Sequence, residues 1–88
     1  MHVRTYPVAG RNLQLQVVEF QDETVVTLYE PNPAQDLRYI RGSWAAPAED
    51  VTLPVPAIQG LYIRFRAGGG NRTASPLDDD KVLGTWNL

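Results

Sequence analysis

Hydrophobic and polar residues alternate with a period of two over most of the chain. The alternation is clearest in the segment LQLQV at 13–17 and in the segment LYIRFR at 61–66. A period of two places successive side chains on opposite faces of a β-strand. Each segment is therefore predicted to be a strand with one face in a core and the other in water.

The phase of this pattern shifts by one residue at Val18, after which Val18 and Phe20 are the apolar positions. In a period-two pattern such a shift moves the apolar side chains to the opposite face. A β-bulge near Val17 and Val18 would explain the shift. Burial of both faces of the strand would explain it equally well, so both interpretations stay open.

The first thirty residues predict a three-stranded antiparallel meander. The segment TVVTLY at 24–29 is rich in β-branched and aromatic residues on both faces, which is typical of a central strand. A shorter strand is predicted at 3–8, and polar turns are predicted at 9–12 and 21–23. The prolines that begin at Pro31 are expected to end the meander, because proline cannot donate to a ladder.

The segment 33–40 fits either a short helix or a strand. A helix would have Asn32 as its N-cap and Pro33 in its first position. The segment 33–39 also shares its pattern with 47–53, which runs into a strand-like sequence. We therefore expect a turn that starts at a proline and leads into a strand in both places.

The second half of the chain is expected to add more strands. Pro54 and Pro56 lie two residues apart in the segment 51–56, so their missing N–H groups would face one side and make it an edge strand. A flexible Gly-rich loop is predicted at 67–75, a helical turn at 75–78 and a last strand at 81–88. The predicted fold is all-β, a small barrel or sandwich of about six or seven short, mostly antiparallel strands with at most one short helical turn.

Composition limits the chain to one domain, residues 1–88, and narrows the classes of function. The chain has 88 residues, of which 43% are hydrophobic, and it has no cysteine. No apolar run is long enough for a membrane span, and no signal peptide is visible, so a cytoplasmic protein that does not contact membranes is expected. A net charge of −2 argues against sequence-independent binding to duplex DNA.

The residues that could carry chemistry do not form a recognisable constellation. The only histidine is His2, and the chain has no cysteine, so few residues are available to form a catalytic triad of nucleophile, histidine and acid. The acidic run at 78–80 lacks the spacing of a calcium loop, and the glycines at 68–70 lack the Lys-Ser/Thr ending of a phosphate loop. We therefore expect no enzyme activity, no metal site and no cofactor.

The candidate site is a binding surface made of aromatic and basic residues. Tyr62, Arg64 and Arg66 point outward on one predicted strand, Arg72 lies in the next predicted loop, and Trp44 lies in another loop. Arginine and tryptophan are enriched at protein interfaces, so the first hypothesis is a protein-interaction, accessory or inhibitor module. Tyrosine next to arginine also resembles the surface with which OB-fold and cold-shock barrels bind single-stranded nucleic acid, which is the alternative. A homo-oligomer formed through a sheet face is a third possibility.

Overall fold

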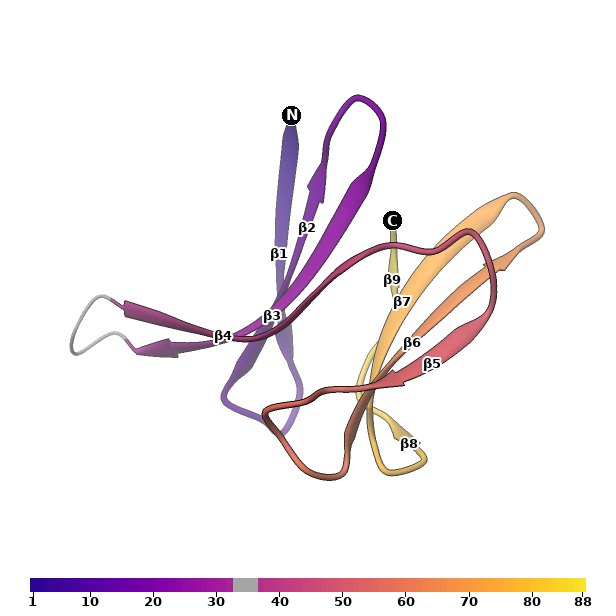
Figure 1. Cartoon of the computed structure of the whole chain (residues 1–88). Coiled ribbons are helices and arrows are strands. Elements are labelled where there is room, and N and C mark those ends of the chain that lie inside the picture. Colours follow the sequence, from indigo (N-terminus) through magenta and orange to yellow (C-terminus); the bar gives the residue numbers. More distant parts are fainter. Residues whose placement is uncertain (33–36) are drawn as a thin grey trace.

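The computed structural model describes residues 1–32 and 37–88 and shows two antiparallel sheets packed face to face (Figure 1). Sheet A has the order β1-β2-β3-β4 and contains β1 (His2–Val8), β2 (Leu13–Glu19), β3 (Thr24–Asn32) and β4 (Leu37–Ala45). Sheet B has the order β5-β6-β7-β8, with β9 also paired to β7, and contains β5 (Val51–Pro54), β6 (Leu61–Gly68), β7 (Asn71–Asp78), β8 (Lys81–Val82) and β9 (Trp86–Asn87). The described residues form no helix, which confirms the all-β prediction, and the two sheets make a sandwich rather than a closed barrel.

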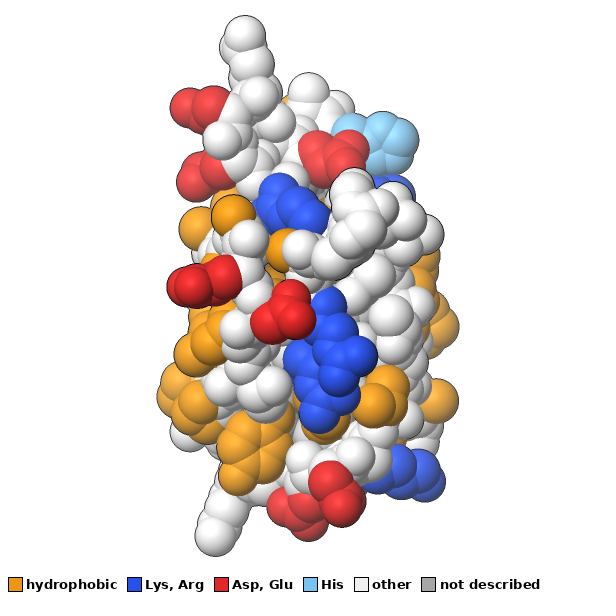
Figure 2. All heavy atoms as spheres, turned by 90° about the vertical axis from the view of Figure 1, so that its right-hand side faces the viewer, with side chains coloured by type: hydrophobic (Ala, Val, Ile, Leu, Met, Phe, Trp, Pro, Cys, Tyr) orange, Lys and Arg blue, Asp and Glu red, His pale blue; other side chains and the backbone are white. Residues whose placement is uncertain are grey.

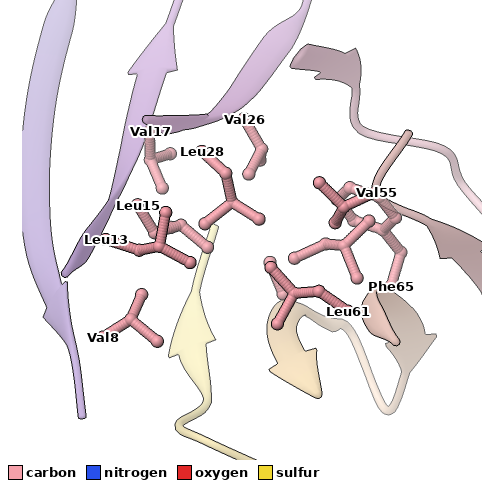
Figure 3. Packing of buried hydrophobic residues seen from close by; sticks show 11 residues of the cluster. Val8, Leu13, Leu15, Val17, Val26, Leu28, Val55, Leu61 and Phe65 are labelled. Carbon is pink, nitrogen blue, oxygen red and sulfur yellow. The ribbon is translucent and has the colours of Figure 1, made fainter. Parts of the chain in front are cut away.

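The core lies between the two sheets and is built from the alternating residues. The apolar residues of 13–17 and of 61–65 are at most 3% exposed, and they point toward one another across the gap between the sheets (Figure 3). Full burial of one such aliphatic or aromatic side chain contributes about 1.5–3 kcal/mol. The predicted inward faces of these two strands are therefore confirmed.

The phase shift at Val18 is not a bulge. The register between β1 and β2 runs without interruption from His2 opposite Glu19 to Val8 opposite Leu13. Val18 instead lies half-buried on the outer face of sheet A. The irregularity of sheet A lies between β3 and β4, where Arg41 is the extra residue. Beyond this bulge the two strands continue as a hairpin that projects from the sandwich (Figure 1).

The expectation that Pro31 ends the meander is wrong. Strand β3 continues to Asn32 and pairs with β4 as far as that residue. Its pairing with β2 stops at Tyr29, so beyond this point one side of β3 is open and a proline interrupts no ladder there. Residues 37–40 belong to β4, as the strand interpretation predicted. The start of the alternative helix falls in 33–36, outside the described residues.

The predicted flexible loop at 67–75 and helical turn at 75–78 are also wrong. Strands β6 and β7 form a continuous hairpin that is closed by Gly69 and Gly70 alone. Both glycines have positive φ, 63° and 80°, which is the backbone of a two-residue hairpin turn that other residues rarely adopt. The glycine run therefore marks a tight turn, and residues 71–78 form a strand.

The edge strand is confirmed. Strand β5 pairs only with β6, and just after it the N–H of Val55 donates to the carbonyl of Leu61 at 2.9 Å. Because successive amides of a strand point to opposite sides, the nitrogen of Pro54 faces away from β6, so the open side of sheet B is blunted there. The prediction that Pro56 belongs to the same strand is wrong, because β5 ends at Pro54 and Pro56 lies in a turn in which the N–H of Ile58 donates to the carbonyl of Val55.

A Gly-x-Trp triplet at 42–44 connects β4 to sheet B. The ring of Trp44 packs against the core and meets Phe65 edge-on, with 6.3 Å between the ring centroids. It also covers Gly42, where an added Cβ would come within 2.4 Å of the ring. Trp44 was expected in a loop, and this expectation is wrong because the residue lies in β4.

A second Gly-x-Trp triplet, at 84–86, makes the corresponding connection from sheet B to sheet A. The ring of Trp86 stacks on Tyr6 of β1 with 5.3 Å between the centroids. A Cβ on Gly84 would lie 2.6 Å from that ring. In each sheet, therefore, one tryptophan ring covers a glycine of its own triplet and contacts an aromatic ring of the other sheet.

We predict that Gly42→Ala and Gly84→Ala each lower the free energy of unfolding by about 1–3 kcal/mol, because the added methyl group must displace an indole ring. Urea unfolding followed by tryptophan fluorescence measures this change. Gly68→Ala is the control, since a Cβ there meets nothing within 4 Å, and its effect should stay within about 0.5 kcal/mol. Equal effects at all three glycines would contradict the role assigned to the two triplets.

Candidate functional site

The outer face of sheet B carries Tyr62, Arg64 and Arg66 of β6. They alternate with the buried residues of the same strand, so they point away from the core, as predicted. Tyr62 and Arg64 are half-buried and Arg66 is exposed. Figure 2 shows this side of the molecule, with basic side chains near its middle and hydrophobic and acidic side chains around them.

Within the strands β5 and β7, the residues directly opposite the two arginines are uncharged. The register places Thr52 and Ser75 opposite Arg64, and Thr73 opposite Arg66. On a strand, alternate residues lie about 7 Å apart, so the two arginines lie side by side, and the nearest acidic residue at this face is Asp50, just before β5.

A shallow depression of about 290 Å³ lies beside the two arginines. Its lining includes Thr52, Arg64, Arg66 and Asp50. The carboxylate of Asp50 accepts a hydrogen bond from the backbone N–H of Ala67 at 2.8 Å, so it is held at the end of β6. The depression therefore has a basic side formed by the arginines and one fixed acid at its margin.

Arg64 and Arg66 differ from the other arginines in having no partner. Every other arginine with a described side chain is engaged: Arg4 with Glu19, Arg11 with Asp78, Arg41 with Glu30, and Arg72 with backbone carbonyls. Among the described residues, no hydrogen bond or ion pair involves the guanidinium of Arg64 or Arg66. Their hydrogen-bonding capacity is therefore directed at solvent or at a ligand.

Arg72 does not join this surface. It lies in β7 opposite Ala67 and on the same side of the strand as the buried Ala74. Its Nη2 donates to the carbonyl of Ala46 at 2.7 Å, and so ties β7 to the connection between the two sheets. The sequence pattern predicts a loop at 67–75 that includes Arg72, and so does not predict this role. Which way a side chain points can be predicted only when its residue is assigned to a strand.

Trp44 is also separate from the outer face of sheet B. Its ring lies between the sheets, as described above, whereas Tyr62 points outward. The structure therefore brings together three of the five predicted contact residues and places Trp44 and Arg72 in the framework of the fold.

A second crevice, of about 270 Å³, lies between the β1–β2 turn and the β7–β8 hairpin. The ion pair between Arg11 and Asp78, at 2.8 Å, crosses it and joins the two sheets. Within residues 1–32 and 37–88 no three His, Cys, Asp or Glu side chains are grouped as metal ligands. The same part of the chain contains no helix that is long and apolar enough to span a membrane.

Comparison with known proteins gives no assignment. No family model, curated protein or solved structure matches this chain significantly. The function is therefore inferred from the surface of sheet B itself.

We predict that Arg72→Met lowers the free energy of unfolding by about 1–3 kcal/mol, because the carbonyls of Ala46 and Pro47 lose their donor while the apolar stem is kept. The matched variant Arg66→Met should change stability by less than about 0.5 kcal/mol. Urea unfolding measures both variants. A larger loss for Arg66→Met than for Arg72→Met would reverse the roles assigned to the two residues.

Proposed function

We propose that this protein is a non-catalytic interaction module that binds an acidic surface of another protein through the outer face of sheet B. Tyr62, Arg64 and Arg66 are its principal contacts. The observation that supports this proposal is the pair of adjacent, unpartnered arginines on β6, in a chain whose other described arginines are engaged.

The arrangement favours an anionic ligand on electrostatic grounds. Two guanidinium groups on alternate residues of one strand repel each other, and a carboxylate placed between or beside them offsets this repulsion. Guanidinium forks bind carboxylates through two parallel hydrogen bonds, which lysine cannot do. Arg64 is half-buried, so part of its side-chain entropy is already lost before a partner binds.

Tyr62 adds an apolar contact next to the charged pair. Pro54 of β5 and Leu77 of β7 lie opposite it, and Leu77 is only 1% exposed. The ring therefore rests beside apolar neighbours with one side toward solvent. Tyrosine and arginine are both enriched among the few residues that dominate the binding energy at protein interfaces.

Single-stranded nucleic acid is a less favourable ligand for this face. Binding of single strands normally uses several aromatic rings on which successive bases stack, together with a net basic groove. Tyr62 is the one aromatic residue that points outward from the described strands of sheet B, and the chain has a net charge of −2. A protein partner therefore fits the surface better, and nucleic acid is an outcome that the experiment distinguishes.

We predict that the tagged protein retains a stoichiometric protein partner from a lysate of its source cells at low salt, with or without nuclease. The double variant Arg64→Ala/Arg66→Ala should weaken the affinity for that purified partner by about thirtyfold or more, as is typical of the loss of interface hot spots. Tyr62→Ala should weaken it by about tenfold. Surface plasmon resonance measures these affinities.

Arg41→Ala is the control for this experiment, because Arg41 is paired with Glu30 and lies on sheet A. It should leave the affinity unchanged. Binding that survives the double variant would contradict the proposal. If instead the tagged protein retains nucleic acid and no protein, and this nucleic acid is released steeply as the salt concentration rises, the result would support single-stranded nucleic acid as the ligand.

A further inference from the structure

The outer face of sheet A carries no charged residue where it covers the core. The side chains that point outward there come from all four strands and are Val3, Thr5, Pro7, Gln14, Gln16, Val18, Val25, Thr27, Tyr29, Ile40, Ser43 and Ala45. Charged residues make up 20% of the chain, yet at these positions they are absent. A sheet face that remains in water usually alternates apolar inward residues with charged or strongly polar outward ones.

The register arranges these residues in three rows across the sheet. The first row is apolar: Val3, Val18, Val25 and Ala45. The middle row is neutral and polar: Thr5, Gln16, Thr27 and Ser43. The third row consists of Pro7, Gln14, Tyr29 and Ile40. In this row Tyr29 is only 5% exposed and donates a hydrogen bond to Gln14, so Pro7 and Ile40 are its open apolar positions.

The two edge strands leave large apolar side chains of these rows in water. Val3 is 47% exposed and Ile40 is 68% exposed. They lie at opposite corners of the face, in the first and third rows. The phase shift at Val18 also belongs here, because it adds an apolar residue to the first row rather than to the core.

We infer that this face is covered by the same face of a second copy of the chain. An uncharged surface has little to lose on desolvation and exerts no like-charge repulsion on an identical surface, although each copy has a net charge of −2. A charged partner would find no complementary group on it. A second copy offers matching chemistry at every row.

A two-fold axis along the middle row gives this match. It places the first row of one copy on the third row of the other, strand over the same strand, so that Val3 meets Pro7 and Ala45 meets Ile40, while Val18 meets the amide of Gln14. The middle row then faces itself, and its hydroxyl and amide groups can both donate and accept hydrogen bonds. Packing of this kind, with sheets about 10 Å apart, is that of an ordinary β-sandwich.

The size of the face sets the expected strength of the dimer. Four strands spaced at about 4.8 Å and three rows spaced at about 7 Å make a face of about 400 Å² on each copy. The dimer would bury roughly 800 Å² in total, which is less than standard stable interfaces bury, so we expect a weak dimer with a dissociation constant on the order of 100 µM. The dimer would leave the outer face of sheet B free, so it is independent of the proposed function.

Sedimentation equilibrium tests the dimer directly, over protein concentrations from about 1 µM to about 1 mM. The wild-type chain should pass from monomer to dimer over this range. Gln16→Glu places a charge at the centre of the face and should raise the dissociation constant by at least about tenfold. Gln59→Glu is the matched control, because Gln59 is exposed in the turn before β6, and it should behave as wild type. A chain that is monomeric throughout, or a Gln16→Glu variant that dimerises like wild type, would overturn the inference.

A distance measurement identifies the face that is used. Since the chain has no cysteine, a spin label can be attached at Thr52→Cys, which is exposed on the outer face of sheet B. In the inferred dimer four sheets are stacked, and the two labels lie on the outermost ones, at least about 30 Å apart. Electron–electron double resonance should show this separation. A separation below about 20 Å would show that the copies meet through sheet B, and would overturn the inference.

Discussion

The structure depends on the contact between the inner faces of the two sheets. Leu13, Leu15 and Val17 on one side and the apolar residues of 61–65 on the other exclude water from the space between them. Since side chains alternate along a strand, this contact also decides which residues point outward. The two arginines of β6 are held on the surface because their neighbours in the sequence are held in the core.

The sequence was sufficient for those features that depend on local alternation. It predicted the all-β class, the inward faces of β2 and β6, the outward direction of Tyr62, Arg64 and Arg66, and the proline-blunted edge at β5. It did not predict the places of Trp44 and Arg72. Their roles depend on contacts with distant segments, Phe65 in one case and the carbonyl of Ala46 in the other, which no local pattern records. The same holds for the bulge opposite Tyr29.

The arginines serve different purposes in different parts of the molecule. Arg11 and Arg72 are used inside the molecule, where they join segments of the two sheets. Arg64 and Arg66 are left without partners on one outer face, and the other outer face is neutral. An acidic partner and a second copy of the chain would therefore not compete for the same surface.

The proline of the β5 edge, Pro54, has a consequence for the kind of assembly that the protein can form. A sheet that grows by adding strands at its edge repeats the same contact without limit, which leads to filaments. Pro54 turns ring carbons rather than an N–H group toward that edge, so a strand added there would lack a donor. A two-fold contact through a sheet face closes after one step. Growth of sheet B at the β5 edge is therefore disfavoured relative to a closed dimer.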